Sequence, residues 1–85
     1  MYYVYILKSK KCGKNIYIGF TSNIKERFKQ HNNKEVYSTK YGVPWELIYC
    51  EIYKSKKDAN DRESKLKKYG STLRHLKQRI KHSLV

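Results

Sequence analysis

The sequence contains few residues that interrupt or cross-link a chain. One proline and four glycines stand among 85 residues, so no Pro- or Gly-rich linker divides it. Cys12 and Cys50 are far apart and the histidines lack zinc-finger spacing, which favours reduced thiols over a disulfide or a zinc site. The longest apolar run, residues 2–7, is too short for a membrane span or a signal-peptide core. We therefore expect one small cytoplasmic domain over residues 1–85.

Acidic residues are also scarce, and this scarcity narrows the choice of partner. Seven Asp and Glu face 20 Lys and Arg, which leaves a formal net charge of +13. The excess favours nucleic acid, an anionic membrane surface or phosphorylated material. A mean hydropathy of −0.91 leans towards disorder, but 39% apolar and 14% aromatic residues indicate a folded core. Nine of the aromatic residues are tyrosines, which can bury a ring and keep a polar tip.

Segments rich in β-branched and aromatic residues predict three strands, over 2–7, 15–19 and 44–53. The polar turn over 8–14 is short, so the first two strands are expected to form an antiparallel hairpin. Residues 34–43 are polar and weakly patterned, and we expect a loop there.

Two helices are predicted after residues that cap helix N-termini. The first runs over 24–32 and follows Thr21-Ser22-Asn23, which are three consecutive capping residue types. The second runs from Ser55 to about Lys68, and Gly70 is expected to mark its end.

A third helix is expected over 72–84, because apolar residues recur there at helical spacing: Leu73, Leu76, Ile80 and Leu84. The element order is then β-β-α-β-α-α. This order predicts an α/β fold of the α+β type, in which three helices flank a three-stranded antiparallel sheet.

Side-chain alternation divides the predicted strands into two faces. One face predicts an ordinary apolar core of Val4, Ile6, Ile16, Ile18, Ile48, Cys50 and Ile52. The other is rich in phenols and holds Tyr3, Tyr5, Leu7, Tyr17, Gly19, Leu47 and Tyr49. This second face is either a half-exposed packing surface or the floor of a polar site, and alternation alone leaves both open.

Glu63 is the first candidate functional residue. It lies four residues after Ala59 and three before Leu66, on the inward stripe of its helix. A carboxylate that points towards a core is costly unless a cation meets it. A salt bridge to Arg27, Arg62 or a lysine would explain it, as would a shifted register, and the functional alternative is a metal site.

Arg27 and His31 are one turn apart on the first helix. They are either a solvated helix face or a pair that binds phosphate and moves a proton. Tyr5 and Tyr17 are weaker candidates alone, because a free phenol, with a pKa of about 10, is a poor base at neutral pH.

Taken together, these residues resemble the GIY-YIG endonucleases. The first family motif stands here as Tyr3-Val4-Tyr5 and the second as Tyr17-Ile18-Gly19. A capped helix with Arg27 and His31 follows, and then a helix of the pattern Ala-x-x-Arg-Glu-x-x-Leu-Lys over 59–67. The resemblance covers about residues 2–69. It is greatest to the small stand-alone members related to the nuclease module of the bacterial excision-repair endonuclease.

The resemblance implies hydrolysis of DNA phosphodiester bonds with a single divalent cation, Mg²⁺ or Mn²⁺, held by Glu63. Tyr17 would orient or deprotonate the attacking water, and Arg27 would bind the scissile phosphate. Tyr5 and His31 would hydrogen-bond the phosphate or the water and assist proton transfer. A role in repair or recombination on branched or damaged DNA is implied, with a protein partner that supplies targeting.

Basic residues dominate residues 54–81, where eleven Lys and Arg face three Asp and Glu. We expect a DNA-binding surface here, formed by Lys67, Arg74, Lys77, Arg79 and Lys81. A solvated cationic face is the alternative, and a membrane-surface role is disfavoured because no aromatic insertion face is present. Two functions without catalysis are also compatible with the sequence: a nucleic-acid-binding module, and a basic accessory protein.

Overall fold

A three-stranded antiparallel sheet forms the centre of the molecule, and the computed structural model describes all of residues 1–85. Its strands lie in the order β2-β1-β3. Their bounds are Tyr2–Ser9 for β1, Ile16–Thr21 for β2 and Trp45–Tyr53 for β3. Strand β1 pairs antiparallel with both neighbours, and β1 and β2 form the expected hairpin.

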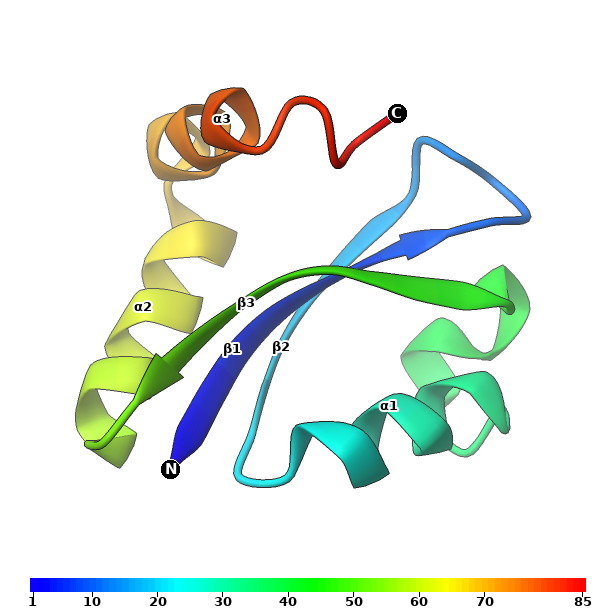
Figure 1. Cartoon of the computed structure of the whole chain (residues 1–85), viewed down its shortest axis with the longest axis horizontal. Coiled ribbons are helices and arrows are strands. Elements are labelled where there is room, and N and C mark those ends of the chain that lie inside the picture. Colours follow the sequence, from blue (N-terminus) through cyan, green and yellow to red (C-terminus); the bar gives the residue numbers. More distant parts are fainter.

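Helices cover both faces of this sheet (Figure 1). Their bounds are Ile24–Asn32 for α1, Lys56–Lys68 for α2 and Gly70–Arg79 for α3, with a short 3₁₀-helix η1 over Tyr37–Gly42. In the view of Figure 1, α2 and α3 lie on one side of the strands, and α1 and η1 on the other. The predicted α+β class and the order β-β-α-β-α-α are confirmed. No helix combines the length and the apolar character that crossing a membrane requires.

The central strand has no face open to solvent. Its residues Val4, Tyr5, Ile6 and Leu7 are each at most 1% exposed. Val4 and Ile6 belong to a cluster beneath α2 and α3 that also holds Ile18, Ala59, Leu66 and Leu76. Tyr5 and Leu7 belong to a second cluster with Trp45, against which α1 residues Ile24 and Phe28 pack. Every polar group on this strand therefore needs a partner inside the protein.

The predicted alternation is wrong for the second half of β3. Ile6 pairs with Tyr49 but the next residue, Leu7, pairs with Leu47, so β3 carries an extra residue at this point. A bulge of this kind reverses which side chains face each side of the sheet beyond it. Tyr49 thus packs against the α2–α3 cluster, whereas Cys50 packs beside Tyr5 and Trp45. Ile52, expected in the core, is 62% exposed.

The first two helices begin where their caps predict. The Asn23 side chain accepts a hydrogen bond from the backbone N–H of Glu26, and the Ser55 hydroxyl accepts one from that of Asp58. The expected bounds of the third helix are wrong. Gly70 begins α3 instead of separating it from α2. The helix ends at Arg79, and the C-cap residue Ile80, whose N–H still bonds the Leu76 carbonyl, leaves the helical conformation. A second departure is η1, which occupies the segment expected to be a loop.

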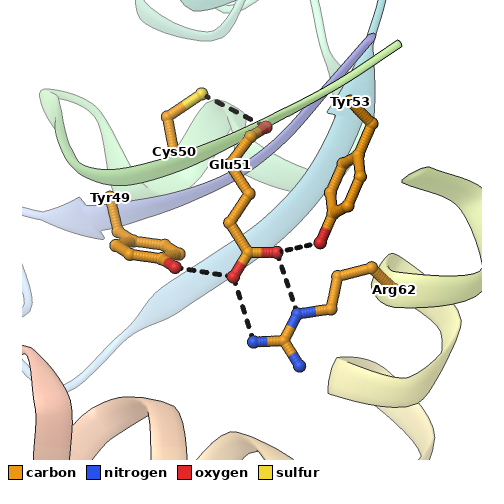
Figure 2. Close-up of polar contacts among 5 residues, drawn as sticks. All are labelled: Tyr49, Cys50, Glu51, Tyr53 and Arg62. Carbon is orange, nitrogen blue, oxygen red and sulfur yellow. Dashed lines mark hydrogen bonds and ion pairs between the residues drawn. The ribbon is translucent and has the colours of Figure 1, made fainter. Parts of the chain in front are cut away.

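An ion pair fixes α2 on the sheet (Figure 2). The Arg62 guanidinium on α2 donates two hydrogen bonds to the Glu51 carboxylate on β3, at 2.9 and 3.0 Å. The hydroxyls of Tyr49 and Tyr53 each donate a further bond of 2.6 Å to the same carboxylate. Burial raises the pKa of Glu51, but these donors outweigh it and hold the pKa below its usual range. Glu51 therefore stays ionised and paired at neutral pH.

Replacing Arg62 by Leu tests the importance of this pair. The change leaves a half-buried carboxylate without its cation, and we expect the free energy of unfolding to fall by about 2–3 kcal/mol. Urea denaturation monitored by circular dichroism measures the change. Lys65→Met is the matched control, since Lys65 is an exposed cation of the same helix without an ion pair. Equal stability of the two variants would contradict a structural role for the pair.

Candidate active site

The site begins with a close approach between β1 and β2. Tyr5 lies opposite Gly19 in the hairpin register. A Cβ atom at position 19 would overlap the Tyr5 ring and hydroxyl, so the phenol crosses the strand at a place that only glycine leaves open. Tyr17 packs on the same side of the sheet, with its ring centroid 6.3 Å from that of Tyr5. Gly19, Tyr5 and Tyr17 of the two motifs therefore form one packed unit.

A buried hydrogen-bond chain leads inward from Tyr5. Its hydroxyl lies 2.7 Å from Nε2 of His31 on α1, and Nδ1 of His31 lies 2.8 Å from Oγ1 of Thr39 in η1. The Thr39 hydroxyl donates to the carbonyl of Val36 at 3.3 Å, so its oxygen is free to accept from Nδ1–H. If the imidazole is neutral and Nδ1 carries its proton, Nε2 accepts a hydrogen bond from the Tyr5 hydroxyl.

Burial supports this protonation state. His31 is fully buried, and burial together with the positive charge of Arg27 lowers the pKa of the imidazole to about 4. Burial also raises the pKa of Tyr5 to about 12, although the nearby Arg27 guanidinium opposes this rise. At neutral pH, Tyr5 is therefore a hydrogen-bond donor and His31 an acceptor.

Thr39, Trp45 and Asn32 complete this side of the site, and the sequence analysis missed all three. The Trp45 indole N–H donates to the Thr39 carbonyl at 2.8 Å. The Asn32 side chain accepts from the backbone N–H of Trp45 and donates to its carbonyl. No sequence signal marks Thr39, because it lies in a polar segment without periodicity. Its role depends on η1, which brings it beneath His31.

Arg27 and Glu63 approach this unit from two different helices. Arg27 is half-buried on α1, where its guanidinium donates to the Gln30 side chain at 3.1 Å. The charge of Arg27 acts on both Tyr5 and His31. Glu63 of α2 also contributes to the rise in the pKa of Tyr5, and Lys67, which pairs with Glu63, lies beside the Tyr17 ring. Contacts therefore join Tyr5, Tyr17 and His31 directly, and Arg27 and Glu63 are the charged groups that act on Tyr5.

Glu63 forms the salt bridge to a lysine that the sequence analysis considered. Its Oε2 lies 3.3 Å from Nζ of Lys67, one turn further along α2. Nζ of Lys67 lies 5.9 Å from the Tyr17 ring centroid, so α2 reaches the edge strand β2 at this point. Arg62, another suggested partner, pairs with Glu51 instead.

Glu63 is the one carboxylate among the candidate residues, so a divalent cation at this site would have Glu63 as its protein ligand. No group of three or more His, Cys, Asp or Glu side chains converges anywhere in the chain. Mg²⁺ accepts such a site, because it keeps several waters and takes further oxygens from substrate phosphates. The Lys67 ammonium shows that the Glu63 carboxylate already attracts a cation. This ion pair is half-exposed, and a pair of that kind stabilises by about 0–1 kcal/mol, so a stronger cation could displace it.

The remaining predicted DNA-binding residues lie outside this group. Arg74, Lys77 and Arg79 are exposed on α3, and Lys81 is exposed just beyond it. Helix α3 packs on α2 through its other face, where Leu76 is buried and Leu73 half-buried. No hydrogen bond or ion pair joins the four basic residues to the Tyr5–Glu63 group.

Comparison with known proteins agrees with these motifs. The family model of the GIY-YIG catalytic domain matches residues 1–69. A UPF0213 protein of Clostridium perfringens is 41% identical over 69 residues, covering 80% of this chain and 72% of that protein. A UPF0213 protein of Staphylococcus haemolyticus is 38% identical over 70 residues, covering 81% of this chain and 83% of that protein. No solved structure matches the chain.

The buried imidazole predicts a pH-dependent loss of stability. A His31 pKa near 4 in the folded state and about 6.5 in the unfolded chain means that unfolding takes up a proton between these values. The stabilising contribution is complete above the unfolded pKa and is lost as pH falls towards the folded one. We expect the titration of His31 to lower the free energy of unfolding by about 2 kcal/mol between pH 7 and pH 5.

Urea denaturation of the wild type and of His31→Gln at the two pH values isolates this contribution. The glutamine variant is expected to be less stable at pH 7 but to lose less stability on acidification. Parallel losses in both proteins would show that His31 does not remain neutral in the folded state.

Proposed function

Since this chain belongs to the GIY-YIG catalytic-domain family, a nuclease family, we propose that it is an endonuclease that hydrolyses DNA phosphodiester bonds with one Mg²⁺ or Mn²⁺ ion. The observation that carries the proposal is the contact of Tyr5 with His31 and Tyr17, together with the charges of Arg27 and Glu63 that act on Tyr5. Four different elements supply these side chains, and packing of a fold alone does not require such a gathering of polar groups.

In this proposal Arg27 binds the scissile phosphate, because a guanidinium can hold two phosphate oxygens and offset charge that develops in the transition state. Tyr17, half-exposed at the mouth of the site, orients the attacking water. Glu63 holds the divalent cation, which when bound stabilises the leaving oxygen.

The hydrogen-bond chain provides a route for the proton of the attacking water. Tyr5 can accept this proton while it passes its own to Nε2 of His31, which is neutral and already accepts from the phenol. A bound phosphate would also offset the charge of Arg27, which is one of the two causes that lower the pKa of His31. Substrate binding therefore makes the imidazole a better proton acceptor.

The proposal extends to substrate and setting. The basic residues Lys67, Arg74, Lys77, Arg79 and Lys81 would contact phosphates of DNA on either side of the site. We propose branched or damaged DNA as substrate, in repair or recombination, with a protein partner that supplies targeting. The cytoplasm, where two free thiols persist, is the proposed compartment.

One observation favours a second candidate, a DNA-binding module without catalysis. The Glu63 carboxylate is paired with Lys67, so an ion pair within the protein is enough to account for this acid. Both candidates bind DNA, and they differ in whether Glu63 is needed for strand cleavage.

The Glu63→Gln variant separates them. We expect it to reduce Mg²⁺- or Mn²⁺-dependent nicking of DNA at least about 100-fold while DNA binding is retained, because the amide keeps the shape but loses the charge that holds the cation. Nicking is measured over a panel of plasmid, branched and single-stranded substrates, and binding by fluorescence anisotropy.

Asp61→Asn is the matched control, since Asp61 is an exposed acid of the same helix outside the site. It should cleave like the wild type. If the wild type cuts no substrate of the panel with either metal, the enzymatic proposal fails and the binding module remains. If both variants cut equally, Glu63 does not hold the catalytic metal.

The basic surface predicts a change in the salt dependence of binding. Replacing Arg74 and Lys77 by Gln should reduce the slope of log affinity against log salt by about 2, because each lost phosphate contact contributes about 0.9. Lys56→Gln/Lys57→Gln removes the same charge from the first turn of α2 and should leave the slope close to that of the wild type. Equal slopes for the two double variants would indicate a solvated cationic face.

A further inference from the structure

A pocket of about 400 Å³ opens directly beside the candidate active site. It lies between the turn that joins β1 to β2 and the 3₁₀-helix η1, with Trp45 also in its wall. Tyr17 lines this pocket and also belongs to the Tyr5–His31 group, so the two sites share a wall. None of the proposed chemical steps uses the pocket.

The lining combines flat rings with hydrogen-bonding groups. Tyr17, Tyr41 and Trp45 supply aromatic surface, whereas Asn15 and Ser38 supply an amide and a hydroxyl. Lys11 is the charged residue of the wall, and no carboxylate lines the pocket. Nucleobases are bound by this combination, since a ring stacks on an aromatic side chain while amides and hydroxyls bond its edge.

The rim of the pocket adds exposed aromatic surface and positive charge. Tyr41 is 74% exposed, so much of its ring surface is available to a ligand in the pocket. The Lys40 ammonium lies 5.0 Å from the Tyr41 ring centroid and 4.4 Å from that of Tyr37. An exposed ring with the Lys40 ammonium beside it suits a base and the phosphate that follows it.

The size and position of the pocket select an unpaired nucleotide. Pockets of a few hundred Å³ hold small ligands, and a stacked base pair has no ring face free to enter one. We propose that this pocket binds one unpaired nucleotide of the DNA strand next to the scissile phosphate. The inference rests on the proposed function for the identity of the polymer. It specifies the substrate as DNA in which single-stranded and duplex segments meet.

Cys12 provides a direct probe of the pocket. Its thiol is exposed and lies in the pocket wall, whereas Cys50 is half-buried on β3. The rate of alkylation of Cys12 by neutral iodoacetamide is measured in EDTA, where no cleavage occurs, with Cys12→Ser to assign the signal. The protein is saturated, as judged by anisotropy, either with a blunt duplex or with the same duplex carrying a single-stranded overhang.

We expect the overhang to slow alkylation of Cys12 at least about fivefold relative to the blunt duplex. Equal rates with the two DNAs at saturation would overturn the proposal. So would equal protection by a saturating peptide polyanion such as polyglutamate, because the pocket would then respond to charge alone.

Tyr41→Ala gives a second, independent readout. Loss of one base-stacking ring should weaken binding of the overhang DNA about tenfold, from about 1–3 kcal/mol per stacked base, and leave blunt-duplex binding unchanged. Tyr41→Phe should restore the affinity. Tyr37→Ala is the matched control, because Tyr37 is equally exposed on the same 3₁₀-helix but does not line the pocket.

These measurements are independent of cleavage. A protein that never cuts DNA but shows protection of Cys12 by the overhang retains the pocket and loses the proposed catalysis. A protein that cuts DNA but shows equal alkylation with both DNAs retains the catalysis and loses the pocket.

Discussion

The enclosure of β1 is the constraint on which the rest of the structure depends. A strand with both faces covered cannot leave a polar group to water, so the Tyr5 hydroxyl must find a partner inside the protein. The Tyr5 hydroxyl is hydrogen-bonded to His31, and His31 is hydrogen-bonded to the Thr39 hydroxyl. The carbonyl of Thr39 in turn accepts a hydrogen bond from the Trp45 indole. One buried phenol thereby ties the central strand to α1, to η1 and to the start of β3. The same chain keeps the imidazole neutral and pointed at the phenol.

On the other side of the sheet, apolar packing and an ion pair hold α2 in place. Ala59 and Leu66 bury one side of α2, and the Arg62–Glu51 pair ties the helix to β3. Glu63 follows Arg62 directly, so the rotation that satisfies the ion pair also sets the direction of the next side chain, towards β2. A structural ion pair and a candidate metal ligand are therefore coupled through one helix turn. The site at β2 depends on both the Tyr5–His31–Thr39 hydrogen bonds and the Arg62–Glu51 ion pair, since neither face of the sheet holds all of its residues.

Much of this arrangement follows from the sequence. Caps at Asn23 and Ser55 predicted where two helices begin, and the two family motifs placed Tyr5, Tyr17 and Gly19 on paired strands. The bulge in β3 was not predictable, because strict alternation is the default and the insertion depends on pairing with β1. Thr39 was missed for a related reason: its function arises from a tertiary contact in a segment without periodicity. The hydrogen bonds around Glu51 were partly predictable, since Tyr49, Glu51 and Tyr53 alternate along one strand and therefore share a face.

The location of the metal tests the assembled site most directly. Mn²⁺ broadens the nuclear magnetic resonance signals of nearby nuclei, and ¹⁵N-labelled protein can be titrated with it at substoichiometric ratios. Binding at Glu63 predicts selective broadening of amides around Glu63 on α2 and around Tyr17 on β2, and loss of this effect in Glu63→Gln. Broadening that leaves β2 unaffected, or that persists in the glutamine variant, would contradict a metal site assembled between α2 and β2.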